Sequence, residues 1–257
     1  MRWFVLTTTW LLTAALCRAQ DPHFGLSLSV NGGLAQKVLR GQPLLVETLL
    51  LLEEGDRATV ALNNNAPWTN ALALQLRSRD GTAVSVTWSR LQAANGPMNF
   101  TSDATEITAI LSLDESATMS LQPGEYLLMA VLDTKGISAT GAWAGTIRSR
   151  DSVMVVIDEP PELDRPGQIL KSRLRARWLQ LSGQVEPALA ELDKLLERFP
   201  EEIEVLSDRC EVLIELGLRE EAVTTIQTAI SLFRKQNPTA THPPRLLLRR
   251  LADSSLY

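Results

Sequence analysis

The hydrophobic period of the chain changes near residue 160, and this change constrains the fold more than any other feature. Between about residues 24 and 157, apolar residues alternate with polar ones in short runs separated by turn residues. Beyond residue 167 they recur at helical spacing. Alternation is typical of half-buried strands, and spacing of three and four residues is typical of helices. The 257 residues therefore predict a multidomain chain, with an all-β part followed by an all-α part.

The first part is predicted to be an antiparallel β-sandwich. Six or more short alternating runs are separated by turn residues. One pair of runs, ending at Leu76 and starting at Val84, encloses Asp80-Gly81, which is a strong hairpin signal. A denser apolar run over residues 44–52 predicts a strand that is buried on both faces. Many short strands joined by turns favour a sandwich.

One segment of this part is more specific. Residues 121–133 read LQPGEYLLMAVLD, in which Pro123-Gly124 turns the chain and Tyr126 can return its hydroxyl to the backbone. The segment resembles the tyrosine corner of immunoglobulin-like and fibronectin-like domains. Residues 141–156 resemble the last hairpin of bacterial extracellular immunoglobulin-like modules. The resemblance implies an Ig-like sandwich over residues 20–158, and it carries only the fold class because the Cys…Trp…Cys pattern of antibody domains is missing.

Residues 1–19 are predicted to be a cleaved signal peptide. Arg2 precedes an uncharged stretch over residues 3–16, and Cys17-Arg18-Ala19 is a small-x-small ending. The stretch is shorter than the ~20 residues that span a bilayer, and no later run is apolar enough to do so. We therefore expect an exported protein, periplasmic or extracellular, with no stable membrane span after cleavage.

Residues 159–167 are predicted to be a stiff, proline-rich linker. Beyond it, Gly183 and Gly217 lie 34 residues apart, as do Ala188 and Ala222, and this interval is typical of helix-turn-helix repeats. The chain here resembles the tetratricopeptide repeat (TPR) family. The residues that match the family pattern are Ala176, Leu179, Gly183, Ala188, Leu192 and Pro200 in the first copy, and Cys210, Leu213, Gly217, Ala222, Ile226 and Ala229 in the second.

The resemblance implies two TPR-like helical hairpins over residues 168–236. A stable stack usually needs at least ~3 repeats, so two copies should lean on another element. Residues 237–257 form a C-terminal tail that is predicted to hold a capping helix over the last repeat. The alternative for this helix, which carries Leu247, Leu248 and Leu251, is a basic membrane-surface or partner helix.

By the same resemblance, the first helix of each copy lines an inner groove. The residues expected to bind a partner there are Arg173, Arg177 and Gln180 from the first copy, and Ser207, Glu211, Ile214 and Glu215 from the second. A basic wall beside an acidic wall would orient a peptide of mixed charge. Equally, these charges could pair with each other and leave no ligand site.

Composition excludes several classes of function. The chain has 25 Lys plus Arg against 30 Asp plus Glu, a net charge of −5, so it is a poor general nucleic-acid binder. Two histidines and two cysteines argue against a His/Cys metal cluster. No catalytic motif occurs, and Cys210 stands where the repeat requires a small buried residue. We therefore expect no enzyme activity, no cofactor and no bound metal.

Two hypotheses of function follow. The first is an exported, non-catalytic interaction or scaffold protein, whose repeats dock a protein or peptide and whose sandwich is a spacer or second recognition surface; self-association is a further option. The second is a carbohydrate-binding module or hydrolase accessory protein that uses the sandwich, with Trp68, Trp88 and Trp143 stacking on sugars if they share one face. Trp88 is expected in the core, whereas Trp68 follows Pro67 in an expected loop.

Overall fold

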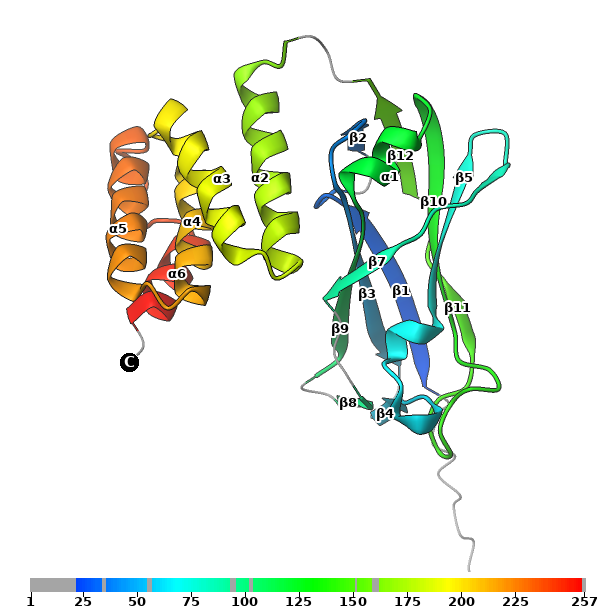
Figure 1. Ribbon diagram of the computed structural model, residues 1–257. Helices are drawn as coiled ribbons and strands as arrows, with labels where there is room; N and C mark the ends of the chain where they lie inside the picture. The colour runs from blue at the N-terminus through cyan, green and yellow to red at the C-terminus, as the bar shows by residue number, and fades with distance from the viewer. Residues whose placement is uncertain are drawn as a thin grey trace, which may run out of the picture.

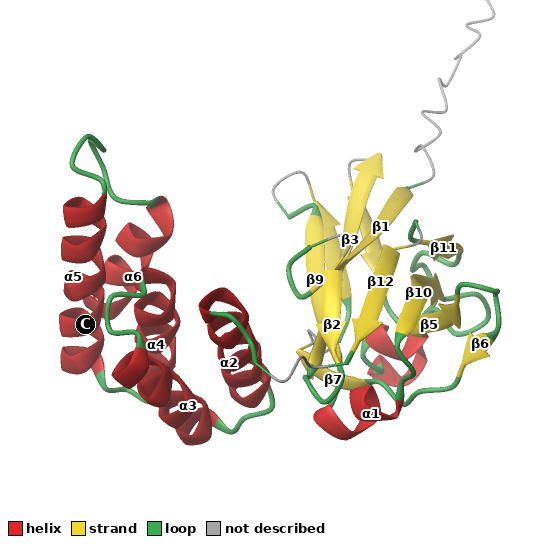
Figure 2. Cartoon of the chain, turned by 90° about the horizontal axis from the view of Figure 1, so that it is seen from above, coloured by secondary structure: helices red, strands yellow, loops and turns green. Residues whose placement is uncertain are grey.

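A computed structural model describes residues 22–33, 36–54, 57–92, 96–101, 104–150, 152–158 and 162–255. The predicted signal peptide at residues 1–19 and part of the predicted linker, residues 159–161, lie outside the described residues. The described chain consists of a β-sandwich followed by a row of antiparallel helices (Figure 1). The two parts stand side by side, with the first helix of the row next to the sandwich (Figure 2).

The sandwich contains two main sheets. The first has the strand order β1 (His23–Val30), β3 (Leu44–Glu54), β9 (Glu106–Leu113) and β7 (Ser89–Gln92). The second has the order β2 (Gln36–Leu39), β12 (Ser152–Ile157), β10 (Gly124–Asp133), β5 (Leu72–Ser78) and β6 (Ala83–Val84), with β11 (Thr146–Arg148) also on β10. Neighbouring strands are antiparallel except β12 and β2, which are parallel.

Shorter elements close the ends of the sandwich. They are the paired strands β4 (Arg57–Val60) and β8 (Met98–Thr101), the 3₁₀ turns η1 (Asn63–Asn65) and η2 (Trp68–Ala71), and the short helix α1 (Glu115–Ser120). Asp114 caps α1, because its carboxylate accepts a hydrogen bond of 2.7 Å from the backbone N–H of Ala117.

The core lies between the two sheets, as alternation requires. On β1, Phe24, Leu26, Leu28 and Val30 are buried and Ser27 between them is exposed. The predicted hairpin at Asp80-Gly81 is present, since β5 and β6 pair across it. The predicted tyrosine corner is also present, because the hydroxyl of Tyr126 donates a hydrogen bond of 2.7 Å to the carbonyl of Gln122.

Of the three tryptophans, Trp68 is placed differently from the prediction. Trp68, expected in a loop, lies in η2 and is fully buried in the core. Trp88, expected in the core, is half-buried and packs against the core cluster, although residues 85–88 form no strand. Trp143 packs edge-on against Phe24, with ring centroids 5.1 Å apart. Burial of Trp68 therefore rules out the sugar-stacking face that Trp68 would have shared with Trp143.

The second part consists of five helices: α2 (Arg165–Leu181), α3 (Val185–Arg198), α4 (Ile203–Glu215), α5 (Arg219–Gln236) and α6 (Arg245–Ser255). Gly183 and Gly217 have φ of +77° and +75°, and this left-handed conformation ends α2 and α4 and turns the chain. Ala188 and Ala222 are fully buried where the helices of each hairpin approach closely. The helices thus form two hairpins, α2–α3 and α4–α5, followed by α6.

Helix α2 begins at Arg165, inside the stretch that was predicted as a linker. Asp164 caps it by accepting a hydrogen bond of 2.9 Å from the N–H of Gly167. Pro166 is tolerated because the first turn of a helix needs no donor there. The prediction of a linker over residues 165–167 was therefore wrong.

Both ends of the helical row have a neighbour. At one end α2 lies beside β3, and Arg175 Nε is 3.3 Å from Glu115 Oε1 of α1. At the other end α6 packs on α4 and α5, and Leu247 is buried there. These contacts cover surface that two hairpins alone would expose.

Candidate functional site

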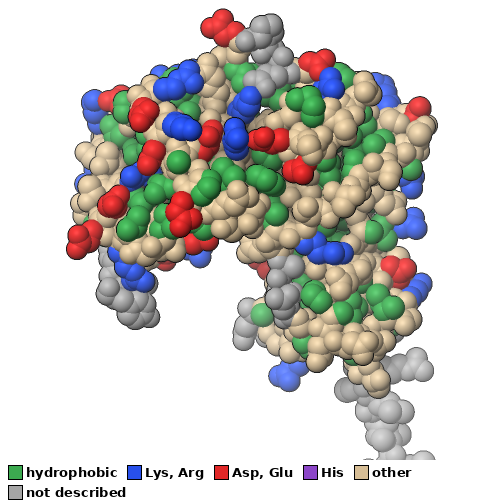
Figure 3. Space-filling model, in the orientation of Figure 1, with side chains coloured by type: hydrophobic (Ala, Val, Ile, Leu, Met, Phe, Trp, Pro, Cys, Tyr) green, Lys and Arg blue, Asp and Glu red, His purple; other side chains and the backbone are tan. Residues whose placement is uncertain are grey.

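Two stripes of polar side chains, one on α2 and one on α4, face each other. Residues three or four apart on a helix share one face. The stripe on α2 contains Arg173, Arg177 and Gln180. The stripe on α4 contains Glu204, Asp208, Glu211 and Glu215. Acidic and basic side chains are accordingly interspersed over the helical part of the molecule (Figure 3).

The two stripes are joined by ion pairs and hydrogen bonds. Arg173 donates to Asp208, with Nε 2.6 Å from Oδ2, and also to Glu204. Arg177 donates to Glu211 at 2.8 Å. Further along, Gln180 Nε2 donates to Glu215 at 2.8 Å. Charges on the facing helices therefore pair within the chain, as one of the two expectations for the groove stated, although a pocket remains beside the pairs.

Arg250 extends this network to the last helix. It reaches from α6 and donates to Glu211, which also accepts from Arg177. One carboxylate thus joins the three helices α2, α4 and α6. Helices α2, α4 and α6 are thus joined by charge, and α4 and α6 also by apolar packing.

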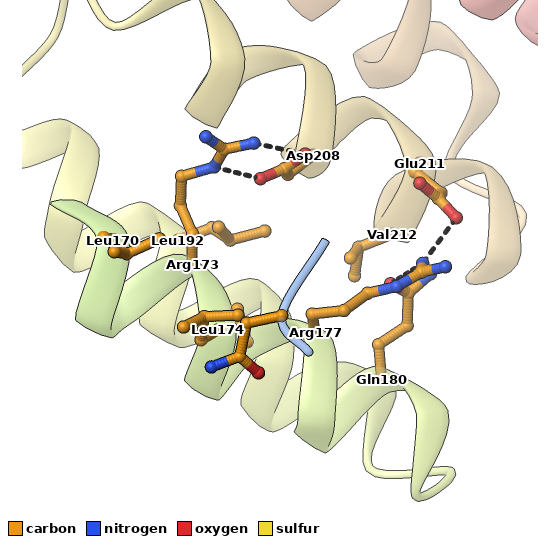
Figure 4. A pocket seen from close by; sticks show the side chains of 11 residues that line it. Leu170, Arg173, Leu174, Arg177, Gln180, Leu192, Asp208, Glu211 and Val212 are labelled. Carbon is orange, nitrogen blue, oxygen red and sulfur yellow. Dashed lines mark hydrogen bonds and ion pairs between the residues drawn. The ribbon is translucent and has the colours of Figure 1, made fainter. Parts of the chain in front are cut away.

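A pocket of about 300 Å³ lies along the stripes. Its apolar lining residues are Leu170, Leu174, Ala176, Leu192 and Val212, and its polar lining residues are Asn31, Arg173, Arg177, Gln180, Asp208 and Glu211. Figure 4 shows the two arginines pointing across it toward the acids of α4. Asn31 comes from the turn after β1, so the sandwich supplies part of the wall.

Burial sets the electrostatics of the Arg173–Asp208 pair. Burial raises the pKa of Asp208 above its usual 3.8, and the hydrogen bond and charge of Arg173 offset only part of this effect. For Arg173, burial acts to lower the pKa, but the bonds and charges of Asp208 and Glu204 outweigh it and the pKa is raised. Asp208 is therefore a carboxylate whose charge is costly in the folded protein.

The structure brings together most of the predicted partner-binding residues. Arg173, Arg177, Gln180 and Glu211 line the pocket, and Glu215 lies next to it through its bond to Gln180. The two remaining residues do not line it.

Ser207 and Ile214 lie on another face of α4. Ser207 is buried and Ile214 packs against the apolar cluster of the second hairpin. Both are roughly 80° around the helix from the acidic stripe. Neither residue lines the pocket, because both side chains turn from the acidic stripe toward the apolar packing of the second hairpin.

Sequence reasoning missed Asp208, Glu204 and Arg250. The signal for the first two was present, since Glu204, Asp208, Glu211 and Glu215 follow the 4-3-4 spacing of one helix face. Arg250 could not be found in this way, because its partner Glu211 depends on how α6 packs against α4.

Cys210 has no role in this site. It is fully buried in α4, and burial raises its pKa to about 11. A thiol is the poor nucleophile and the thiolate the good one, so a raised pKa makes this cysteine inert.

Replacing Asp208 by asparagine is expected to change how stability depends on pH. With its raised pKa, the folded protein keeps the proton of Asp208 at pH values where the unfolded chain has lost it. The wild-type free energy of unfolding should therefore fall, relative to Asp208→Asn, as the pH rises above 3.8. Urea unfolding at several values between about pH 4 and 6 measures this difference. If the wild-type free energy of unfolding stayed at a constant offset from that of Asp208→Asn, or rose relative to it with pH, the burial of this carboxylate would be contradicted.

No helix among the described residues combines the length and apolar character that crossing a membrane requires. Within the same residues, no group of three or more His, Cys, Asp or Glu side chains is arranged to hold a metal ion.

Comparisons with known proteins give no family. A scan against protein-family models finds no match, and a search of curated proteins finds none. Among solved structures, AggA, the major subunit of aggregative adherence fimbriae type I from Escherichia coli, is similar at 16% identity and a TM-score of 0.30, over 54% of this chain and 97% of AggA.

Two further structures are similar to about the same degree. MyfA, the major subunit of Myf fimbriae from Yersinia enterocolitica, has 13% identity and a TM-score of 0.26, over 52% of this chain and 98% of its own. A PapD-like domain of human CEP192 has 9% identity and a TM-score of 0.28, over 61% of this chain and 99% of its own. TM-scores this low carry no argument about function, so the sandwich assignment rests on the strand pairing described above.

Proposed function

We propose that this chain is an exported, non-catalytic interaction protein, and that its helical hairpins act as TPR-like repeats that dock a protein or peptide in the α2–α4 groove. The observation that carries the proposal is the pocket between the two stripes, in which an apolar floor is bordered by arginines and carboxylates. The 34-residue interval and the glycine turns support the TPR-like interpretation. Export is inferred from residues 1–19.

The size of the pocket favours part of a macromolecule over a free small molecule. At about 300 Å³ it is at the lower end of the range for ligand pockets, roughly 300–1,000 Å³. It suits one or two side chains of a larger partner. Leu170 at its edge is 48% exposed and offers a contact for an apolar side chain.

The charges around the pocket favour a partner of mixed charge. Arg173 and Arg177 already have carboxylate partners, so a docking peptide must exchange its own charges for these. An exchange of this kind adds little net affinity, because bonds are broken as well as made. It adds specificity, since a peptide with the wrong order of charges would leave partly buried groups unpaired.

The sandwich belongs to this site as well as supporting it. Asn31 lines the pocket, and its side-chain oxygen is held by a hydrogen bond of 3.0 Å from the N–H of Leu45. A partner seated in the pocket would therefore touch both parts of the chain. This arrangement supports the sandwich as a second recognition surface.

Site-specific photo-crosslinking in the cells that make the protein tests the proposal. A benzophenone side chain placed at Leu170 is expected to give a discrete cross-linked product, which mass spectrometry then identifies. The matched control is the same probe at Leu218, which is 42% exposed at the start of α5 and lies outside the pocket. Equal products from both positions, or none from Leu170, would refute docking in this groove.

A further inference from the structure

A second hollow lies between α5 and α6. Its volume is about 310 Å³, and it is lined by Gln227, Ile230, Ser231 and Arg234 of α5 and by Leu248 and Leu251 of α6. Leu248 is 43% exposed there. This α5–α6 groove shares no lining residue with the α2–α4 pocket.

The pairing of the other helices distinguishes α6 from α2 and α4. Helix α2 is paired along its length with α3, and α4 is paired in the same way with α5. Helix α6 follows α4 in the row, yet it has no companion helix of its own among the described residues. Its contacts with α5 and α4 place it as the next first helix of the row.

The internal repeat identifies the face of α5 that is involved. Ile230 is 34 residues after Leu196, and Gln227 is 34 residues after Asp193. On α3, Leu196 packs against the apolar clusters of both hairpins, and Asp193 accepts a hydrogen bond of 2.7 Å from Arg209 of α4. On α5, Gln227 and Ile230 instead line the hollow beside α6. This face of α5 is a helix-binding face with room for one more helix.

The charges beside the groove select the kind of helix. Arg234 lines it, and none of the residues that line it is acidic. A second copy of this basic face would be repelled, whereas an acidic helix would be attracted.

We infer that the α5–α6 groove binds an acidic amphipathic helix of a partner protein. The helix lies along α6 as α3 lies along α2 and α5 along α4. Its apolar stripe carries small residues, as do the two companion helices with their buried Ala188 and Ala222. It contacts Leu248 and Leu251, and its carboxylates face Arg234.

A peptide with the sequence of α3, residues 185–198, serves as the probe, because it is a companion helix with four acidic and two basic residues. Fluorescence anisotropy of the labelled peptide with the full chain is expected to show saturable binding. Leu248→Asp should weaken it about tenfold, since the leucine side chain would lose its apolar contact. Arg234→Glu should weaken it by a similar factor, most clearly at low salt.

Controls separate this surface from other causes. Leu248 is exposed, so circular dichroism should show that Leu248→Asp folds normally. A peptide with Leu192→Asp, which breaks the apolar stripe, should not bind. Equal binding to wild type and Leu248→Asp would overturn the inference, because the peptide would then be binding elsewhere, for example by displacing α3. Self-association of the wild type that Leu248→Asp abolishes, seen by sedimentation, would overturn it in favour of a second copy.

Discussion

Trp68→Ala is expected to lower the free energy of unfolding of the sandwich by about 3–5 kcal/mol, the usual cost of deleting a large buried aromatic side chain. Trp68 is fully buried and belongs to the cluster between the two sheets. That cluster contains no residue of the helices, whose two apolar clusters are separate. The helical signal at 222 nm should therefore unfold at the wild-type urea concentration, while the sandwich unfolds at a lower one.

Two further variants make this result specific. The indole N–H of Trp68 has no hydrogen-bond partner among the described residues, so Trp68→Phe loses no such bond and should cost less than half as much. Val153→Ala, at a β12 position that is 42% exposed, should change stability by less than about 0.5 kcal/mol. If Trp68→Ala shifted both transitions together, the two parts would unfold as one unit and the separation of their cores would be wrong.

Arg173→Asp is expected to destabilise the helical part by about 2–3 kcal/mol. The new carboxylate would face Asp208 and Glu204 with no cation between them. This loss is smaller than the usual cost of breaking a fully buried pair, because the side chains of Arg173 and Asp208 are 27% and 35% exposed. Urea unfolding followed at 222 nm measures the loss.

Exchanging both charges separates stability from recognition. In Arg173→Asp combined with Asp208→Arg, the pair is restored with its direction reversed, and the new arginine lies near Glu204 and Glu211 on its own helix. Most of the stability should return, which a double-mutant cycle measures as a coupling energy of about 1–3 kcal/mol. The cross-link from Leu170 should be lost all the same. A stable double variant that still gave the cross-link would show that the charges do not select the partner.

The sequence predicted the elements of this fold whose causes are local. Alternation, turn residues and the 34-residue interval act over a few residues each, so β1, the hairpin at Asp80-Gly81 and the glycine turns at Gly183 and Gly217 could be read directly. The bond of Tyr126 to Gln122 spans only four residues and could be predicted as well. The start of α2 was missed even though its cap, Asp164, is also local, because three prolines suggested a linker.

Features that depend on packing could not be predicted. Trp68 follows a proline in a polar segment, and only the closure of the two sheets over η2 makes it a core residue. The arginines of α2 could be placed on one face from their spacing, but their partners could not, since Asp208 and Glu211 are chosen by how α2 and α4 lie against each other. The same holds for Arg250 and Glu211.

Helix α2 has attachments of very different strength on its two sides. Arg175 and Glu115, which link it to the sandwich, are 49% and 42% exposed, and an exposed pair contributes at most about 1 kcal/mol. On its other side α2 is held by a row of charges and a shared apolar cluster. A partner that displaces Asn31 from the wall of the pocket would therefore move the sandwich relative to the helices before it separated α2 from α4. The angle between the two halves of the molecule would then report occupancy.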